Sequence, residues 1–509
     1  VDSGSITAEI GDDARVTAAV LRARALGLDE TYQRASASSG GLISAVGADS
    51  KLAILATTLV KMGDRGVHNV GLLDLSSSRV QNFDATSKNL SVGIFAGSGA
   101  SMSTTLTGAA DILIGASKVN AGSITIKADN LADKSKFSAT EESLRSGSAG
   151  LGSITALAAE TDIGTSARRF GANVAFGQGA ELVVEAAPGK TGVFQVDTYA
   201  NANIIDKVRV DGVGGYSVTV AQADQQAMMR STISASGAKI RNLSGNIDLA
   251  TRSDSDLEAA ANVLSIAFIA GAYASADAVV DADNSIRLTN TDVLGNDVRL
   301  MAGQDRLRVP NILLSKAQVD ATLVGLGGAI PLGTSKITER NVIDIGGTSS
   351  VKAIGNVSLL AQPGLGKGER ATVDGLVVAP MPVVFDPRED TADDSINTVT
   401  VGNQAKVEAG INYRTLVQLL PYVVNGDEKL SASRIGTDLT DTEKTALGLD
   451  PAQQYHYAAL DLEDVSLSVA TGSLVELVPG NFKAGTAGQA YMFSPGAGIT
   501  EQSFVLEAE

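Results

Sequence analysis

A degenerate repeat of about 57 residues runs along most of the chain and constrains its fold more than any other feature. In each unit a glycine or turn residue precedes a segment of alternating apolar residues, and the first apolar residue serves as an anchor. The anchors recur at about this interval, at Ile124, Leu182, Ile247, Val298 and Val357, with a weaker one at Ile411. Glycine-rich apolar runs lie about half a repeat before the first five anchors, at Gly97, Gly152, Gly215, Gly271 and Gly328.

Many units also carry a short segment of the form Lys/Ser-Val-x-Ala before the anchor. It occurs at residues 118–121, 350–353 and 406–409, and residues 13–25 resemble the same element in an earlier unit. Alternation over four to six residues predicts strands, and the Gly, Asn, Asp and Ser clusters between them are typical of turns. An all-β repeat fold follows.

The composition favours a parallel β-helix built from these repeats. The chain has 54 Gly and no Trp, which suits a narrow interior of small and β-branched side chains. We expect each unit to hold two to three coils of about 20 to 25 residues, giving 20 or more coils and a rod on the order of 100 Å long. A row of β-sandwich domains is the alternative, but the period is short for a sandwich and the core aromatics are missing.

The expected division is a β-helix shaft over residues 1–385, an acidic insertion over 386–464 and a β-helix continuation over 465–509. The insertion contains residues 440–448, which read as a capping box, one or two helical turns and a glycine stop. The longest apolar stretches are shorter than the roughly 18 to 20 residues that span a bilayer, so we expect no membrane insertion.

The glycine-rich run followed by an A-x-V-x-A-G-x-I-x-L-x-A cassette resembles repeats of large bacterial filamentous adhesins, the leukotoxin-type and filamentous-haemagglutinin-like exoproteins. The resemblance covers most of residues 1–415 through degenerate repeats. It implies a right-handed β-helix shaft, export across the outer membrane, and a role in adhesion, matrix or filament formation.

The inventory of reactive residues argues against an enzyme. The chain has no Cys and two histidines, so a Ser-His-Asp triad, a Cys nucleophile or a His-rich metal site is nearly excluded. His68 reads as a loop residue, and the strings GLGG and GVGG lack the Lys-Ser/Thr of a phosphate loop. A net charge of −17 makes nucleic acid an improbable partner. We expect no cofactor, with calcium as the one ion that the acidic loops would suit.

Acidic residues are the candidate metal ligands, because hard carboxylate oxygens suit calcium. They are Asp386, Glu389, Asp390, Asp393 and Asp394, with Asp281, Asp283 and Asn284 as a second group. Solvated acidic loops are the simpler interpretation, since neither group matches a known calcium motif. A candidate contact patch lies at Tyr455, His456 and Tyr457; packing of the insertion against the shaft is the simpler explanation.

Together these features predict a structural segment of a secreted or surface-exposed bacterial protein, located outside the cell or on its surface. Its expected partners are neighbouring segments or subunits, end to end or side by side, and a host-cell or glycan receptor. A self-assembling filament subunit is the first alternative. A β-helix polysaccharide lyase or hydrolase is the second, and it would need clustered carboxylates or cations on one coil face.

Overall fold

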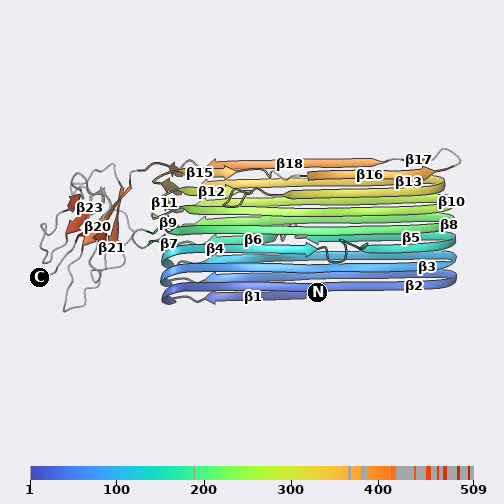
Figure 1. The fold of residues 1–509 in the computed structure, drawn as a ribbon, viewed down its shortest axis with the longest axis horizontal. Coiled ribbons are helices and arrows are strands. Elements are labelled where there is room, and N and C mark those ends of the chain that lie inside the picture. The colour runs from blue at the N-terminus through green and yellow to red at the C-terminus, as the bar shows by residue number, and fades with distance from the viewer. Residues whose placement is uncertain are drawn as a thin grey trace.

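The computed structural model describes residues 2–186, 190–242, 244–364, 368–379, 384–385 and 387–411, and seven shorter segments within 413–504. Nearly all of the described chain is β-strand, and residues 2–408 form one large parallel sheet wound into a β-helix (Figure 1). The fold class predicted from the repeat is therefore confirmed. Within the described residues no helix is long and apolar enough to cross a bilayer.

The strands of the β-helix differ in length. The long strands run along one wall, bend, and return along the other wall, whereas the short strands lie beside the turns. In chain order the strands are β1 (Asp2–Ile10), β2 (Arg15–Met62), β3 (Val67–Ile114), β4 (Lys118–Lys134), β5 (Leu144–Ile163), β6 (Phe170–Phe176), β7 (Glu181–Val184), β8 (Val193–Ser236), β9 (Lys239–Asn242), β10 (Ile247–Thr289), β11 (Asp292–Gly295), β12 (Val298–Ala302), β13 (Leu313–Gly346), β14 (Ser350–Ala353), β15 (Val357–Ala361), β16 (Gly368–Val378), β17 (Val384–Phe385), β18 (Arg388–Val401) and β19 (Lys406–Glu408).

Each repeat makes one coil, so the expectation of two to three coils per repeat is wrong. Residues at the same level of successive coils lie one repeat apart, in the order Arg15, Val67, Lys118, Glu181, Lys239, Asp292, Ser350 and Lys406. The coils are long and flat: β2 alone has 48 residues and folds back at its middle. Each leg therefore spans about 80 Å, whereas the whole stack of coils is only about 34 Å high.

The two ends of each flat coil are closed differently. At one end, on the right of Figure 1, the strand bends back, and the parallel pairing skips one or two residues there, with a register shift between Ile266 and Ile269. The glycine-rich runs form these bends. We call this the bend edge. Bulk is excluded there: a Cβ on Gly150 would lie 2.0 Å from the carbonyl oxygen of Gly93. At the opposite end, the turn edge, short turns such as residues 63–66 separate β2 from β3.

Four of the six anchors stack on one another between successive coils. The residues paired at this level of successive coils are Ile124, Phe194, Ile247, Val298 and Val357. Leu182 stands one element earlier, where it pairs with Val119 and Ile240. The anchor register is therefore correct except at Leu182 and Ile411. Leu182 is displaced because eight residues separate Val184 from Val193, whereas Gly122 alone separates the corresponding Ala121 and Ser123. Ile411 lies beyond the end of β19.

The interior is one layer thick, with inward side chains from two facing walls. Two apolar clusters fill it, one toward the bend edge and one toward the turn edge. Between them runs a polar seam that includes an asparagine ladder: Asn284 Nδ2 donates to Asn341 Oδ1 at 2.9 Å, and Asn341 Nδ2 donates to Asn397 Oδ1 at 2.8 Å. Such a ladder satisfies buried amides only when the coils are in register, so it fixes that register.

A fully buried ion pair on one wall faces the opposite wall inside the cluster nearer the bend edge. Lys134 Nζ lies 2.6 Å from Asp206 Oδ1, and both side chains are inaccessible to solvent. From the opposite wall, Thr161 donates to Asp206 at 2.7 Å and Gln225 donates at 3.2 Å. The pair is thus hydrogen-bonded on several sides, as a buried pair must be.

His68 was expected in a loop, and that expectation is wrong. It lies on β3 and points into the interior, at the level of Val16 and Val119. Its side chain is fully buried, and neither ring nitrogen has a hydrogen-bond partner within the described structure. Burial therefore lowers its pKa and keeps the ring neutral.

The acidic stretch that follows residue 385 is a strand and not an insertion loop. β18 pairs in parallel with β13 from Arg388 to Val401, and β19 pairs with β14, so the ladder passes the expected boundary. The physical reason is that β13 has unpaired backbone groups along one edge. The backbone of the acidic residues forms hydrogen bonds with these groups, whatever side chains the residues carry. Of the expected helix at 440–448, residues 441–442 are described and are helical; the rest lies outside the described residues.

Short strands are described beyond residue 412, and they form separate small sheets. They are β20 (Tyr413–Leu419), β21 (Gln454–Ala459), β22 (Leu467–Ser468), β23 (Leu474–Leu477), β24 (Ala490–Met492) and β25 (Ser503–Phe504). β23 pairs in parallel with β20 and antiparallel with β24, and β22 pairs antiparallel with β25. The described strands of 465–509 therefore lie in small mixed or antiparallel sheets and do not join the large parallel sheet.

Candidate functional site

A groove on the outer wall of the β-helix is the most chemically distinctive site among the described residues. Its floor consists of outward side chains of β4, β8 and β10, and residues 305–307 of the loop between β12 and β13 form its rim. The enclosed volume is about 410 Å³. We call it the outer groove.

The loop that makes the rim is held by its own aspartate. The Asp305 carboxylate accepts hydrogen bonds from the backbone N–H groups of Leu307 and Val309 at 2.8 and 2.9 Å. The backbone N–H of Gln304 donates to the carbonyl of Thr251 on β10 at 3.1 Å. The loop is therefore fixed against the wall, and the groove exists without a ligand to shape it.

Burial raises the pKa of two carboxyl groups in the groove. Burial raises the pKa of Asp197 to about 6, against the opposing pull of Arg306 and Lys127. Burial also raises the pKa of Asp129, although Lys127 lies 2.8 Å from its Oδ2 atom. The Oδ1 atoms of both aspartates are buried and have no hydrogen-bond partner within the described structure. Each therefore lacks the hydrogen bond that would stabilise its charged form, in agreement with the raised pKa of both groups.

An aromatic ring and a guanidinium group stand beside these carboxylates. Tyr199 donates its hydroxyl hydrogen to Asp254 at 2.9 Å, and burial is the largest cause that raises its pKa. The Arg252 guanidinium lies 5.6 Å from the Tyr199 ring centre and pairs with Asp254 at 2.6 Å and with Asp305 at 3.2 Å. The groove therefore offers hydrogen-bond acceptors, fixed cations and one aromatic ring.

The opposite outer wall carries a second carboxylate column. Glu160, Asp224 and Asp277 occupy the same level in successive coils. Burial, followed by the charge of Asp277, raises the pKa of Asp224 to about 6. The column lies on a flat wall and not in a groove, so it offers a ligand less enclosure than the outer groove does.

The main group of predicted calcium ligands is not gathered into a site. Asp386 lies outside the described residues. Glu389 and Asp393 alternate with Asp390 and Asp394 along β18, so the two pairs point to opposite faces of the strand. The carboxylate of Glu389 accepts the backbone N–H of Val373 on β16 at 3.0 Å.

The second predicted group is also committed elsewhere. Asp281 pairs with Arg169 at 2.7 Å, Asp283 lies 3.8 Å from Arg230, and Asn284 belongs to the interior ladder. Across the described ranges no group of three acidic or histidine residues could hold a metal ion. The predicted contact patch, Tyr455, His456 and Tyr457, lies on β21, which pairs in parallel with β20.

Sequence reasoning missed the residues of the outer groove. Lys127 stands beside Asp197, more than one repeat later, because eight residues lie between β7 and β8 in that coil. The floor draws on three coils, and the rim residues come from a fourth. Only the alternation of the strand at 123–129, which puts Lys127 and Asp129 on the outer face, could have indicated part of the site.

Comparisons with known proteins identify no relative of this chain. No family model matches the chain, and neither a curated protein nor a solved structure matches it. The resemblance to filamentous adhesins therefore stays a prediction from the repeat pattern, and function has to be inferred from the residues and geometry described above.

Proposed function

We propose that the chain is a structural segment of a secreted or surface-exposed bacterial filamentous adhesin-like protein, acting as an elongated scaffold for adhesion, matrix or filament formation. The observation that supports it is the unbroken parallel ladder from β1 to β19, in which each coil is held only by its neighbours. Solenoids of this kind grow by adding coils and present outward side chains along flat walls. The absence of Cys agrees with a location outside the cell.

Electron microscopy and binding assays test the scaffold proposal on the purified chain. We expect discrete particles that contain flat, striped slabs, each about 80 Å long, and binding of the protein to cells or to a glycan array. A self-assembling filament subunit would instead polymerise alone, with light scattering that rises with concentration. Compact particles without the slab would overturn the scaffold.

A carbohydrate-cleaving enzyme is the second candidate, and the outer groove favours it. A carboxyl group with a pKa near 6 suits a general acid, which protonates the leaving oxygen of a glycosidic bond while a second carboxylate activates water. Asp197 would be the acid and Asp129 its partner. Release of reducing ends from polysaccharides, abolished by Asp197→Asn and retained by Asp224→Asn on the opposite wall, would establish the enzyme.

A further inference from the structure

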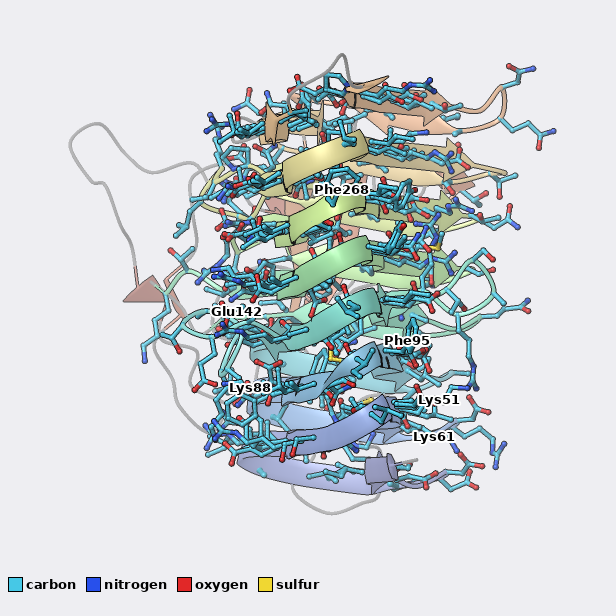
Figure 2. All side chains as sticks on the ribbon, turned by 90° about the vertical axis from the view of Figure 1, so that its right-hand side faces the viewer. Lys51, Lys61, Lys88, Phe95, Glu142 and Phe268 are labelled. Atoms are coloured by element: carbon cyan, nitrogen blue, oxygen red, sulfur yellow. The ribbon has the colours of Figure 1, made fainter. Side chains whose placement is uncertain are left out.

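The bend edge carries a continuous apolar surface, and we infer that it binds the bend edge of a second copy of this chain. Large apolar residues at the bends are exposed by between 42% and 76% of their surface. These residues define the bend ridge: Leu42, Ile43, Ile94, Phe95, Leu151, Ile154, Tyr216, Val218, Phe268 and Ile269. Figure 2 views this edge directly and labels Phe95 and Phe268 on it.

The bend ridge is one surface because the coils are in register. Ile43 pairs with Phe95, and the same level continues through Gly152 and Tyr216 to Ile269. Side chains at one level of a parallel ladder repeat about every 4.8 Å. The exposed residues therefore form a column across five coils, in which Leu151 and Ile154 flank Gly152 and supply the apolar side chains of the middle bend.

The bends carry no charge, although the whole chain has a net charge of −17. Residues 40–48, 92–100, 149–159, 212–223 and 265–276 contain no Asp, Glu, Lys, Arg or His. Charged side chains stand on both flanks of the bends in Figure 2, with Lys88 and Glu142 on one side and Lys51 and Lys61 on the other. An apolar centre with a charged rim is the pattern of a protein interface.

A second copy fits this surface better than a membrane does. Two strongly anionic chains can approach closely only where neither carries charge, and the bend edge meets that condition. An anionic bilayer would repel the chain, and no cluster of Lys or Arg occupies the bends to offset that repulsion.

The area and shape of the bend ridge suit a stable dimer. Its exposed residues present on the order of 1,000 Å² per copy, compared with about 800 Å² per partner in a standard interface. A hollow of about 880 Å³ lies beside the ridge, lined by Gly150, Gly214 and Gly325 as well as by Phe268. Bulky residues next to glycine hollows allow two such edges to interlock. In the proposed scaffold, the bend ridge would be the surface through which copies associate side by side. The dimer itself does not depend on whether the protein acts in adhesion.

Sedimentation velocity on the full chain tests the dimer. We expect the wild type to sediment as a dimer and Phe268→Glu to raise the dissociation constant about tenfold or more. Leu307→Glu is the matched control, because Leu307 is 75% exposed on the rim of the outer groove, away from the bends. Both substitutions are at exposed positions, so circular dichroism should show unchanged folding.

Single cysteines define the geometry, since the chain has no native Cys. Ile154 lies on the middle bend of the ridge and Phe95 on the bend before it. If the Ile154→Cys variant forms disulfide-linked dimers and the Phe95→Cys variant does not, the two copies are antiparallel. If each of the two single variants forms linked dimers, the copies are parallel. Leu307→Cys should not cross-link.

Three outcomes would overturn the inference. They are a wild-type monomer at high micromolar concentration, equal dissociation constants for Phe268→Glu and Leu307→Glu, and a monomer that floats with phosphatidylcholine vesicles in a Phe268-dependent way. The last outcome would assign the ridge to lipid. None of them affects cell or glycan binding, which tests the scaffold proposal separately.

Discussion

The bend edge and the turn edge close the same coil with opposite chemistry. At the turn edge the carboxylate of Asp12 accepts the backbone N–H of Asp64 one coil on, at 2.9 Å, and Asp64 accepts that of Ala116 at 2.8 Å. At the bend edge the outer surface is apolar and free of charge. Inside the bends small hydroxyls bond to each other, as Ser148 does to Thr155 at 2.5 Å.

The contrast shows which groups each kind of coil closure exposes to solvent or to a partner. Stacked aspartates satisfy the backbone of the turns and put their remaining charge into water, so the turn edge needs no partner. At the bends the parallel pairing skips only one or two residues, so few backbone groups need a side-chain partner and the outward side chains are free to be apolar. The turn edge therefore completes the coil, whereas the bend edge is available for association.

The largest difference should appear when a methyl group is added at a glycine of each edge. Gly150→Ala puts Cβ 2.0 Å from a carbonyl oxygen of the next coil, whereas Gly11→Ala at the turn edge meets no atom within 4 Å. We expect Gly150→Ala to lower the free energy of unfolding by about 3 kcal/mol and Gly11→Ala to change it little. Urea denaturation measures both, and equal losses would break the comparison.

A smaller effect should follow removal of one stacked aspartate. Asp64→Ala leaves the backbone N–H of Ala116 without its side-chain acceptor, which should cost about 1 kcal/mol in the free energy of unfolding. Asp64→Asn keeps an acceptor oxygen and serves as the control. If the two variants unfold at the same urea concentration, the hydrogen bond does not stabilise the turn edge.

The walls between the edges should respond to pH. The pKa of Asp224 is about 6 in the folded chain and about 4 when unfolded, so the folded chain binds more protons between these values. Its contribution to the free energy of unfolding therefore falls as pH rises from about 4 to 6 and stays low above 6. Asp224→Asn should add about 1 kcal/mol at pH 7, after allowance for solvent screening. Denaturation at pH 4.5 and 7 checks this, and a larger gain at pH 4.5 would contradict it.

The smallest effect should come from the exposed ion pair at the turn edge. Arg65 lies 2.8 Å from Asp13 and lowers its pKa, so any stabilisation would be lost as pH falls through that pKa, the opposite direction from Asp224. The side chains of Arg65 and Asp13 are 65% and 66% exposed. Asp13 has a left-handed backbone with φ of 57°, which Asn tolerates, so Asp13→Asn should leave the denaturation midpoint unchanged. A measurable shift would mean that the turn edge depends on ion pairs as well as on backbone acceptors.

The outer groove shows why a site on a solenoid is hard to find from sequence. Asp129, Asp197 and Arg252 come from three coils, and the separation in sequence between neighbouring coils varies with the length of the loops. The repeat pattern fixes which strands exist and which side chains point outward. It does not fix which outward residues become neighbours, because one extra loop shifts the register of everything after it.

The sequence by itself determined the strands, the parallel stacking and the period, because alternation and repetition are local properties that any packing of these residues must respect. His68 and the acidic strand at 388–401 were misplaced, since a polar residue in a strand looks like a loop until a neighbouring coil supplies its partner. Only the tertiary structure decided that one repeat makes one coil. A period of about 57 residues is compatible with several small turns or with one long flat loop, and packing of the two walls selects between them. The charge-free bend ridge is a consequence of that choice.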